Sequence, residues 1–120
     1  MITASRLGLL AATLAEALVG CSEGADKFSE AGLSGQRTYQ NVCVACHHPD
    51  PNLAGILGPP LAGASLELLE AKVLSASYPP GYTPKRPTAS MPAFAYLGEK
   101  LPDLEAYLRE VQSEDGTAGK

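Results

Sequence analysis

Apolar residues recur at helical spacing in three segments of the chain, whereas no segment sustains the strict alternation that is typical of a β-strand. The first predicted helix covers about Ala31–Cys43. The second begins at Ser65, a favourable N-cap residue, and ends before the prolines that follow Tyr78. The third begins near Pro102, because proline suits the first turn of a helix. The pattern therefore predicts an all-α fold.

The apolar positions of the third predicted helix form a single stripe, which is the arrangement of a helix that packs against a core. This stripe, at positions i, i+3, i+4 and i+7, consists of Leu104, Tyr107, Leu108 and Val111. Two loops rich in proline and glycine, Pro49–Gly63 and Tyr78–Pro92, separate the three helices. Since proline disrupts a helix interior, this region cannot be one long helix.

The first twenty residues have the layout of a secretory signal peptide. Arg6 is the only charged residue before the apolar run Leu7–Gly20, which Glu16 interrupts. A helix needs about 20 apolar residues to span a bilayer, so this run is not a convincing transmembrane segment.

The apolar run ends in Leu18-Val19-Gly20-Cys21, which resembles the lipobox of bacterial lipoproteins. The resemblance implies that residues 1–20 are a lipoprotein-type signal peptide and that Cys21 is acylated and tethers the chain to a membrane. An ordinary signal peptide cleaved elsewhere and an uncleaved N-terminal helix are the alternatives.

The remainder of the chain divides into three parts. Residues 21–30 are small and polar, and we expect them to form a flexible tether. Residues 31–112 contain the predicted helices and loops and form the folded domain. Residues 113–120 lack apolar periodicity and are expected to be a disordered tail. A domain this small has a limited core and usually needs a disulfide, a metal or a cofactor.

The charge balance excludes one class of partner. The chain has 9 Lys and Arg residues against 13 Asp and Glu residues, which gives a formal net charge of −4. A protein that binds nucleic acid needs a positive surface for the phosphate groups, so we expect no nucleic-acid partner. The 3 cysteines are an odd number, so disulfides alone would leave one thiol unpaired.

Two cysteines and a histidine form the strongest motif in the chain, Cys43-Val44-Ala45-Cys46-His47. This spacing is the attachment signature of c-type haem. One helical turn between Cys43 and Cys46 matches the separation of the two porphyrin vinyl groups to which the thiols add. His47, next in the chain, can then turn onto the haem face and ligate the iron. We therefore predict one covalent haem c at Cys43 and Cys46, with His47 as an axial ligand.

Two other interpretations of the motif are weaker. A redox dithiol is expected beside a βαβ pattern, which the sequence lacks. A zinc site needs four ligands, but the only other cysteine is Cys21 and the only other histidine is His48. Haem attachment also accounts for the cysteine count, because Cys43 and Cys46 become thioethers and Cys21 takes the lipid.

Met91 is the predicted second axial ligand. It is the only methionine besides Met1, and a thioether is a soft ligand that stabilises ferrous iron. The alternatives are that Met91 fills the core, or that an amine of Lys85 or Lys100 takes its place on the iron. His48 adjoins the other ligand and cannot easily reach the opposite haem face, so we expect it to be solvated or to contact its loop.

The order of these features resembles the small class I c-type cytochromes from about residue 35 to residue 111. That family has a glycine and an aromatic residue on its first helix, here Gly35 and Tyr39, and a C-terminal helix similar to Leu104–Leu108. The resemblance implies that the two helices cross closely at the glycine. It also implies a small cytochrome c fold, with three or so helices and Pro/Gly-rich loops wrapped around one haem.

A second part of the resemblance lies in the loop Gly58–Gly63, which is similar to the family's Gly-Pro-x-Leu-x-Gly segment. It implies that the Pro59 carbonyl accepts a hydrogen bond from the Nδ1–H of His47. Such a bond fixes the imidazole ring and raises its donor strength.

Two protein ligands would leave no open position on the iron, so the ligand set implies a single-electron carrier and not an enzyme. Its partners would be redox proteins that it meets through a small, transient interface. Because the chain is acidic, we expect a basic patch on at least one partner. Haem attachment and lipidation both indicate the periplasmic side of a bacterial membrane, with a soluble periplasmic protein as the alternative.

Two further functions stay open. If Met91 does not ligate, a five-coordinate haem would suit a sensor or a peroxidase. The segments Gly58–Gly63 and Met91–Phe94 are also similar to haem c subunits of periplasmic dehydrogenases or thiosulfate-oxidising complexes. Candidates for contact with the haem propionates or with a partner are Tyr78, Tyr82, Lys85 and Arg86.

Overall fold

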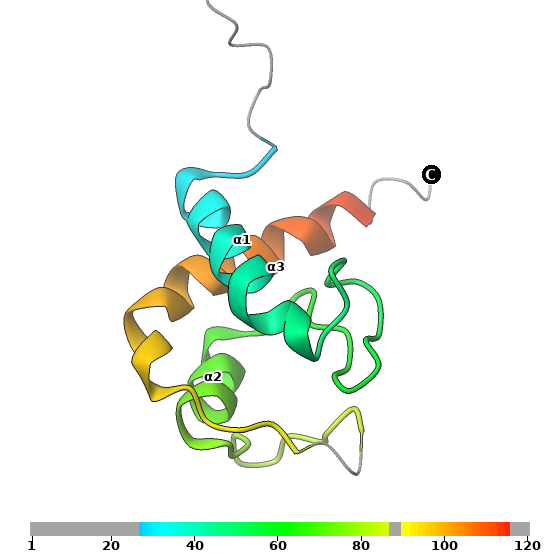
Figure 1. Ribbon diagram of the computed structural model, residues 1–120, viewed down its shortest axis with the longest axis vertical. Helices are drawn as coiled ribbons and strands as arrows, with labels where there is room; N and C mark the ends of the chain where they lie inside the picture. The colour runs from blue at the N-terminus through cyan, green and yellow to red at the C-terminus, as the bar shows by residue number, and fades with distance from the viewer. Residues whose placement is uncertain (1–26, 87–89, 116–120) are drawn as a thin grey trace, which may run out of the picture.

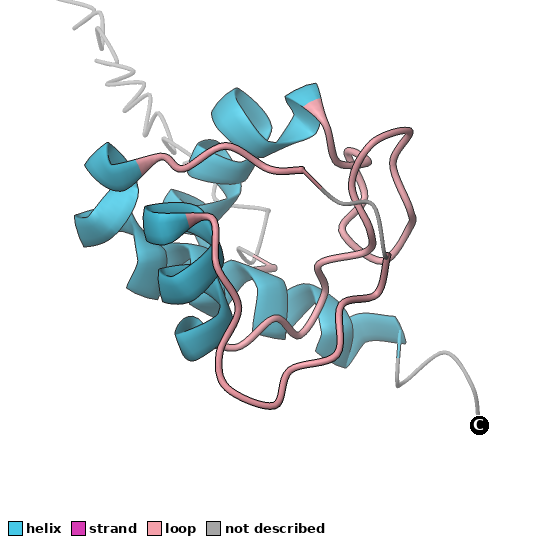
Figure 2. Cartoon of the chain, turned by 90° about the horizontal axis from the view of Figure 1, so that it is seen from below, coloured by secondary structure: helices cyan, strands magenta, loops and turns pink. Residues whose placement is uncertain are grey.

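The structure is a computed structural model that describes residues 27–86 and 90–115, and its regular structure in these ranges is entirely helical (Figure 1). Figure 2 shows the helices joined by long loops, with no strand among the described residues. The predicted all-α fold is therefore confirmed. The elements are α1 (Glu30–Val42), η1 (Cys43–Ala45), α2 (Leu66–Leu69), η2 (Glu70–Leu74), η3 (Ala95–Lys100) and α3 (Leu101–Asp115).

The start of α1 is held by contacts with α3. The Ser29 hydroxyl accepts the Gly32 N–H at 3.0 Å, which makes it the N-cap, and donates to Glu110 Oε1 at 2.6 Å. Phe28 is buried, and its ring packs edge-on against Tyr107 with 5.3 Å between the ring centroids. The ordered body thus begins before residue 31, and residues 27–30, expected to belong to the tether, are part of it.

The helices α1 and α3 cross at short range, as Figure 1 shows, and Gly35 lies at the crossing. A Cβ atom on Gly35 would lie 2.6 Å from the Asp103 carbonyl carbon and 2.9 Å from Leu104 Cα, so only glycine permits this approach. Four large side chains of these two helices are fully buried: Tyr39, Leu101, Leu104 and Leu108. The core therefore forms between the first and the last helix.

The second helical segment begins at Ser65, as predicted, but changes pitch after its first four residues. The Ser65 hydroxyl accepts the Leu68 N–H at 3.3 Å, and α2 then continues into η2, which is π-helical. Single π-helical turns are rare and occur frequently at functional sites. Ala76, with φ of 53°, adopts the left-handed conformation that ends the segment before Tyr78.

One helical element was not predicted from the sequence. The 3₁₀ helix η3 leads directly into α3 and buries Leu97 in the core. Its N-cap residue, Phe94, provides no side-chain cap, so no start signal marks it. As predicted, Pro102 lies in the first turn of α3.

Several predictions fall on parts of the chain that the structure does not describe. The predicted signal peptide (residues 1–20), the predicted lipidation site Cys21 and most of the expected tether lie outside the described residues. At the other end, α3 continues to Asp115, so the first residues of the expected tail are helical. No helix within residues 27–86 and 90–115 is long and apolar enough to cross a membrane.

Candidate functional site

The Cys-x-x-Cys-His motif begins where α1 ends, in a tight turn that includes η1. The Cys43 carbonyl accepts the N–H groups of Cys46 at 3.1 Å and His47 at 2.9 Å, so it organises the whole motif. Neither Cys43 nor Cys46 is in a disulfide, and both thiols are therefore available to form thioethers. Cys43 is half-buried, and burial raises the pKa of its thiol to about 11. Cys46 is exposed.

The His47 ring is buried, with 8% of its surface exposed, and one of its nitrogens is already engaged. Nδ1 lies 2.9 Å from the Pro59 carbonyl oxygen, which can only accept, so Nδ1 carries the proton and donates. The other nitrogen, Nε2, then holds the lone pair that a metal requires. Burial lowers the pKa of His47, and the charge of Arg86 acts in the same direction against the opposing effect of the Pro59 bond. The neutral, ligating form of the imidazole is thereby favoured.

Gly58 shapes the other face of the imidazole. A Cβ atom at this position would collide with Nδ1 and Cε1 of His47 and would lie 2.7 Å from its Cγ. The Gly58 N–H also donates to the Cys46 carbonyl at 2.9 Å, which binds the loop to the motif. The sequence indicated this glycine only as part of the Gly58–Gly63 segment. Its contact with the histidine ring could not be read from the sequence, because it depends on how the loop folds back.

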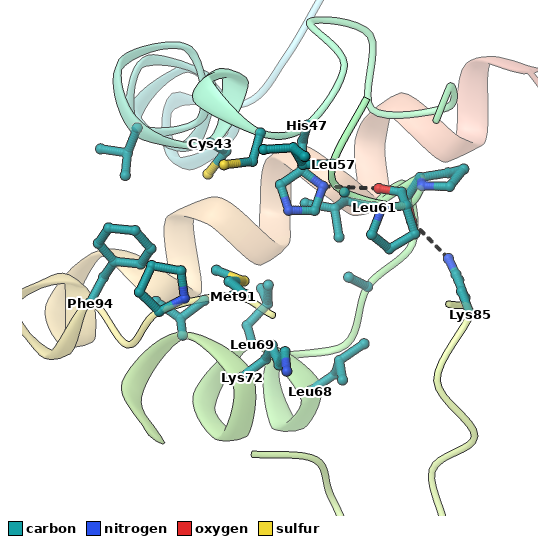
Figure 3. A pocket seen from close by; sticks show the side chains of 18 of the residues that line it. Cys43, His47, Leu57, Leu61, Leu68, Leu69, Lys72, Lys85, Met91 and Phe94 are labelled. Carbon is teal, nitrogen blue, oxygen red and sulfur yellow. Dashed lines mark hydrogen bonds between the residues drawn. The ribbon is translucent and has the colours of Figure 1, made fainter. Parts of the chain in front are cut away.

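A large apolar cavity opens beside the motif (Figure 3). Its empty volume, including the space that is open to solvent, is about 1220 Å³. The five predicted haem-domain site residues that line it are Cys43, Cys46, His47, Pro59 and Met91. The apolar part of its wall includes Leu57, Leu61, Leu68, Leu69, Val73 and Phe94.

Met91 faces the cavity from the side opposite His47, as Figure 3 shows. It is half-buried and lies in an irregular segment ahead of η3. This segment is attached to η2, because the Phe94 N–H donates to the Val73 carbonyl at 2.6 Å. This hydrogen bond therefore fixes the backbone near Met91, whose thioether faces the cavity.

The other residues considered as ligands are arranged differently. Lys85 lines the cavity, but its Nζ donates to the Pro60 carbonyl at 2.9 Å. Lys100 is exposed at the end of η3 and is not part of the cavity wall. His48 contacts its own loop, since its Nδ1 accepts the Asp50 N–H at 2.9 Å.

Aromatic and basic side chains of the loop before Met91 also line the cavity. Tyr78 and Tyr82 stack with 5.4 Å between their ring centroids and 8° between their planes. The Lys72 ammonium lies 4.0 Å from the Tyr78 ring centroid, as in a cation–π contact. Arg86 Nη2 donates to the Gly55 carbonyl at 2.9 Å. The sequence singled out the two tyrosines and Arg86 as candidates, but nothing in it identified their partners.

The residues around the cavity fit a covalently bound haem. Two free thiols lie one turn apart, and a histidine with a fixed tautomer leaves Nε2 for the iron. A thioether faces the same space, and the wall is mostly apolar, as a macrocycle requires. The described residues hold no cluster of three or more His, Cys, Asp or Glu that could bind a bare metal ion instead.

Comparison with known protein families matches residues 33–112 to the family described as Cytochrome c. The match covers two thirds of the chain and includes all of the predicted site residues except Cys21. No curated protein and no solved structure matches the chain.

Proposed function

The chain belongs to the cytochrome c family and binds haem c covalently, and we propose that it is a carrier of single electrons whose iron is held between His47 and Met91. The observation that carries the proposal is that these two side chains face the same apolar cavity from opposite sides (Figure 3). Haem c supplies the iron, which takes up one electron and releases it again. The function of the surrounding residues is to keep its ligands in place.

The residues on the His47 side provide a rigid ligand. The bond to the Pro59 carbonyl fixes the ring, and the absence of a side chain at Gly58 lets the loop approach it closely. A ligand that moves little between the two oxidation states keeps reorganisation small. A hydrogen bond to the outer nitrogen also increases the basicity of the inner nitrogen and thereby stabilises ferric iron.

The residues on the Met91 side exclude water and favour the reduced state. Met91 supplies a soft sulfur ligand, which raises the reduction potential. The apolar side chains that line the cavity limit the access of water to this face. With both axial positions filled by the protein, an electron carrier is favoured over an enzyme.

We further propose that the protein acts on the periplasmic side of a bacterial membrane, anchored by a lipid on Cys21. The family indicates a protein outside the cytoplasm, and the lipobox-like Leu18–Cys21 supports the anchor. Redox partners would approach beside the cavity, where Ile56 is 96% exposed and Leu57 is 65% exposed. An apolar patch of this kind suits a short-lived contact.

The optical spectrum of the matured protein tests this ligand pair. In the oxidised wild type we expect the weak near-red band of methionine sulfur on ferric iron. Met91→Ala should keep the covalent haem but lose this band and bind small ligands such as cyanide much faster. His47→Ala should abolish the low-spin spectrum, because it removes the ligand next to the attachment site.

Lys100→Gln is the matched control, because Lys100 was an alternative ligand but is absent from the cavity wall. It should leave the near-red band unchanged. An unaltered six-coordinate spectrum in Met91→Ala would remove Met91 from the site. Retained haem without the band in the wild type would favour the five-coordinate sensor or peroxidase instead.

A further inference from the structure

Two basic residues of the loop that leads to Met91 reach across to the loop that holds His47. Lys85 Nζ donates to the Pro60 carbonyl at 2.9 Å, a bond drawn in Figure 3. Arg86 donates from Nη2 to the Gly55 carbonyl at 2.9 Å and from Nη1 to the Ile56 carbonyl at 3.3 Å. Each of these bonds joins segments that are 25 or more residues apart in the chain.

The bonded carbonyls lie on both sides of Pro59 in the chain. Arg86 holds the carbonyls four and three residues before it, Lys85 holds the carbonyl of the residue just after it, and Pro59 itself accepts the His47 Nδ1–H. The Gly55 N–H donates to the Gly58 carbonyl at 2.9 Å, so the backbone held by Arg86 is also joined to the residue before Pro59. The position of the acceptor carbonyl therefore depends on both basic side chains.

The loop has no backbone donor of its own between Gly58 and Leu61, whose N–H donates to the Pro51 carbonyl at 2.8 Å. Pro59 and Pro60 have no backbone N–H, so neither can donate a hydrogen bond to anchor the segment. The Gly58 N–H, bonded to the Cys46 carbonyl, is the last backbone donor before them. Side chains from another loop replace the missing backbone bonds, and a guanidinium can span two carbonyls where an ammonium is a single point of contact.

We propose that Lys85 and Arg86 are positioning residues for the axial histidine, which act by holding the Pro59 carbonyl against the Nδ1–H of His47. The proposal deepens the proposed function and rests on His47 as the iron ligand. It assigns these two cations to the ligand's hydrogen bond and not to a partner surface. It also explains why both face the cavity while donating to backbone carbonyls.

The direct test is hydrogen exchange of the His47 Nδ1–H, measured by NMR in the reduced holoprotein. Exchange is compared with that of the Leu108 amide in the core of α3 in the same sample, so that a general loss of stability cancels. In Arg86→Gln and Lys85→Gln we expect the Nδ1 proton to exchange roughly 2- to 12-fold faster than in the wild type, as for the loss of one ordinary hydrogen bond. The reduction potential should rise in Arg86→Lys, which keeps the positive charge, because a weaker bond lowers the donor strength of the ring.

Two further variants separate geometry from charge. Arg86→Lys keeps the charge but loses the fork, so it should still accelerate the exchange. Lys72→Gln removes a cation that lines the same cavity but contacts Tyr78 and not the loop that holds His47. It should therefore leave the exchange of the Nδ1–H unchanged. If Arg86→Gln does not mature with haem, Lys85→Gln and Arg86→Lys carry the test.

The proposal is overturned if the ratio of Nδ1–H to Leu108 exchange stays at the wild-type value in Arg86→Lys and Lys85→Gln. It is also overturned if Lys72→Gln accelerates the exchange as much as these variants do, because charge alone would then be responsible. The failure of the proposed function is distinguishable, because it appears in the near-red band of the wild type and leaves the Nδ1–H measurable.

Discussion

At the scale of single residues, Tyr39 links the core of the protein to the haem-attachment motif. Its side chain is fully buried between α1 and α3, and its hydroxyl donates to the His48 carbonyl at 2.6 Å. The residue next to His47 is thereby held from the core side, while Pro59 holds the imidazole from the loop side. One tyrosine thus couples the packing of the helices to the position of His47.

The ionisation of Tyr39 should make the stability of the protein depend on pH in alkaline solution. Burial raises the pKa of Tyr39 above its ordinary value of 10.0, with the neighbouring Tyr107 acting in the same direction. The stabilisation is complete below about pH 10, since both states are then protonated. Above that pH the unfolded chain loses the proton first, so the free energy of unfolding falls as the pH rises.

Denaturant titrations of the holoprotein from pH 7 to 11 measure this effect. Tyr39→Phe should cost about 0.5–1.5 kcal/mol at neutral pH, through the lost hydrogen bond, and should flatten the alkaline decline. Val111→Ala weakens the core without removing a tyrosine, so it should keep the decline. An equally steep decline in Tyr39→Phe would show that another group is responsible.

The identity of the site residues could be predicted from the sequence, whereas the contacts that hold them in place could not. The spacing of Cys43, Cys46 and His47 specifies a chemistry within five residues, so no fold is needed to recognise it. The bonds of Lys85 and Arg86 have backbone carbonyls as acceptors. Every residue has a carbonyl, so the sequence carries no signal of which ones these side chains meet.

At the scale of elements, the crossing of α1 and α3 determines how the core is built. Gly35 lets the two backbones approach closely, and the side chains around it close the core on both sides of the contact. α1 ends directly at Cys43, so the angle of this crossing also orients the haem-attachment turn. A substitution at Gly35 should therefore lower the stability of the fold and, as a smaller effect, alter the orientation of the haem-attachment turn.

Gly35→Ala should destabilise the holoprotein by about 1–3 kcal/mol, because the added Cβ meets the backbone of Asp103. In a domain of this size each kcal/mol lowers Tm by about 4–8 °C, which differential scanning calorimetry detects. Gly98→Ala is the matched control, since a Cβ there lies 3.9 Å from its nearest neighbour in Leu74. A Tm for Gly35→Ala equal to that of the control would contradict the close crossing.

Elements with periodic patterns and caps were predicted well, and those without them were not. The first helix was placed within one residue at each end, and Ser65 marked the start of the second. By contrast, η3 has no cap residue, and the π-helical pitch of η2 has no signature in its sequence. Both arise from packing, since η2 and η3 lie against each other and share the Phe94–Val73 hydrogen bond.

At the scale of the whole molecule, the cavity takes the place of a second core. Leu61, Leu69, Val73 and Phe94 line it, and two of them, Leu69 and Val73, also belong to the buried cluster between the helices. Leu61 and Phe94 are only half-buried, so without haem this part of the wall would face water. Burying apolar surface is the main source of stability in a domain of this size. The cofactor is therefore a structural part of the fold as well as its redox centre.

A haem-free chain should accordingly lack a cooperative unfolding transition. The double variant Cys43→Ser/Cys46→Ser, which cannot form thioethers, should show little helix by circular dichroism and a broad, non-cooperative thermal melt. Ala45→Ser changes the same exposed turn but keeps both thiols, so it should mature and unfold cooperatively. A sharp transition in the double variant, at the temperature of the holoprotein, would show that the protein core is sufficient alone.

The anchoring of Phe28 and Ser29 also fixes which way the molecule faces. They secure one end of α1 to α3, whereas Cys43 follows the other end, about 20 Å away along a helix of 13 residues. Figure 1 shows the start of α1 on the far side of the molecule from α2, which forms a wall of the cavity. If the chain upstream of Lys27 is attached to a surface, the attachment lies at the end of the molecule opposite the haem cavity. The redox centre would then face away from that surface, and electrons would be exchanged on the side remote from it.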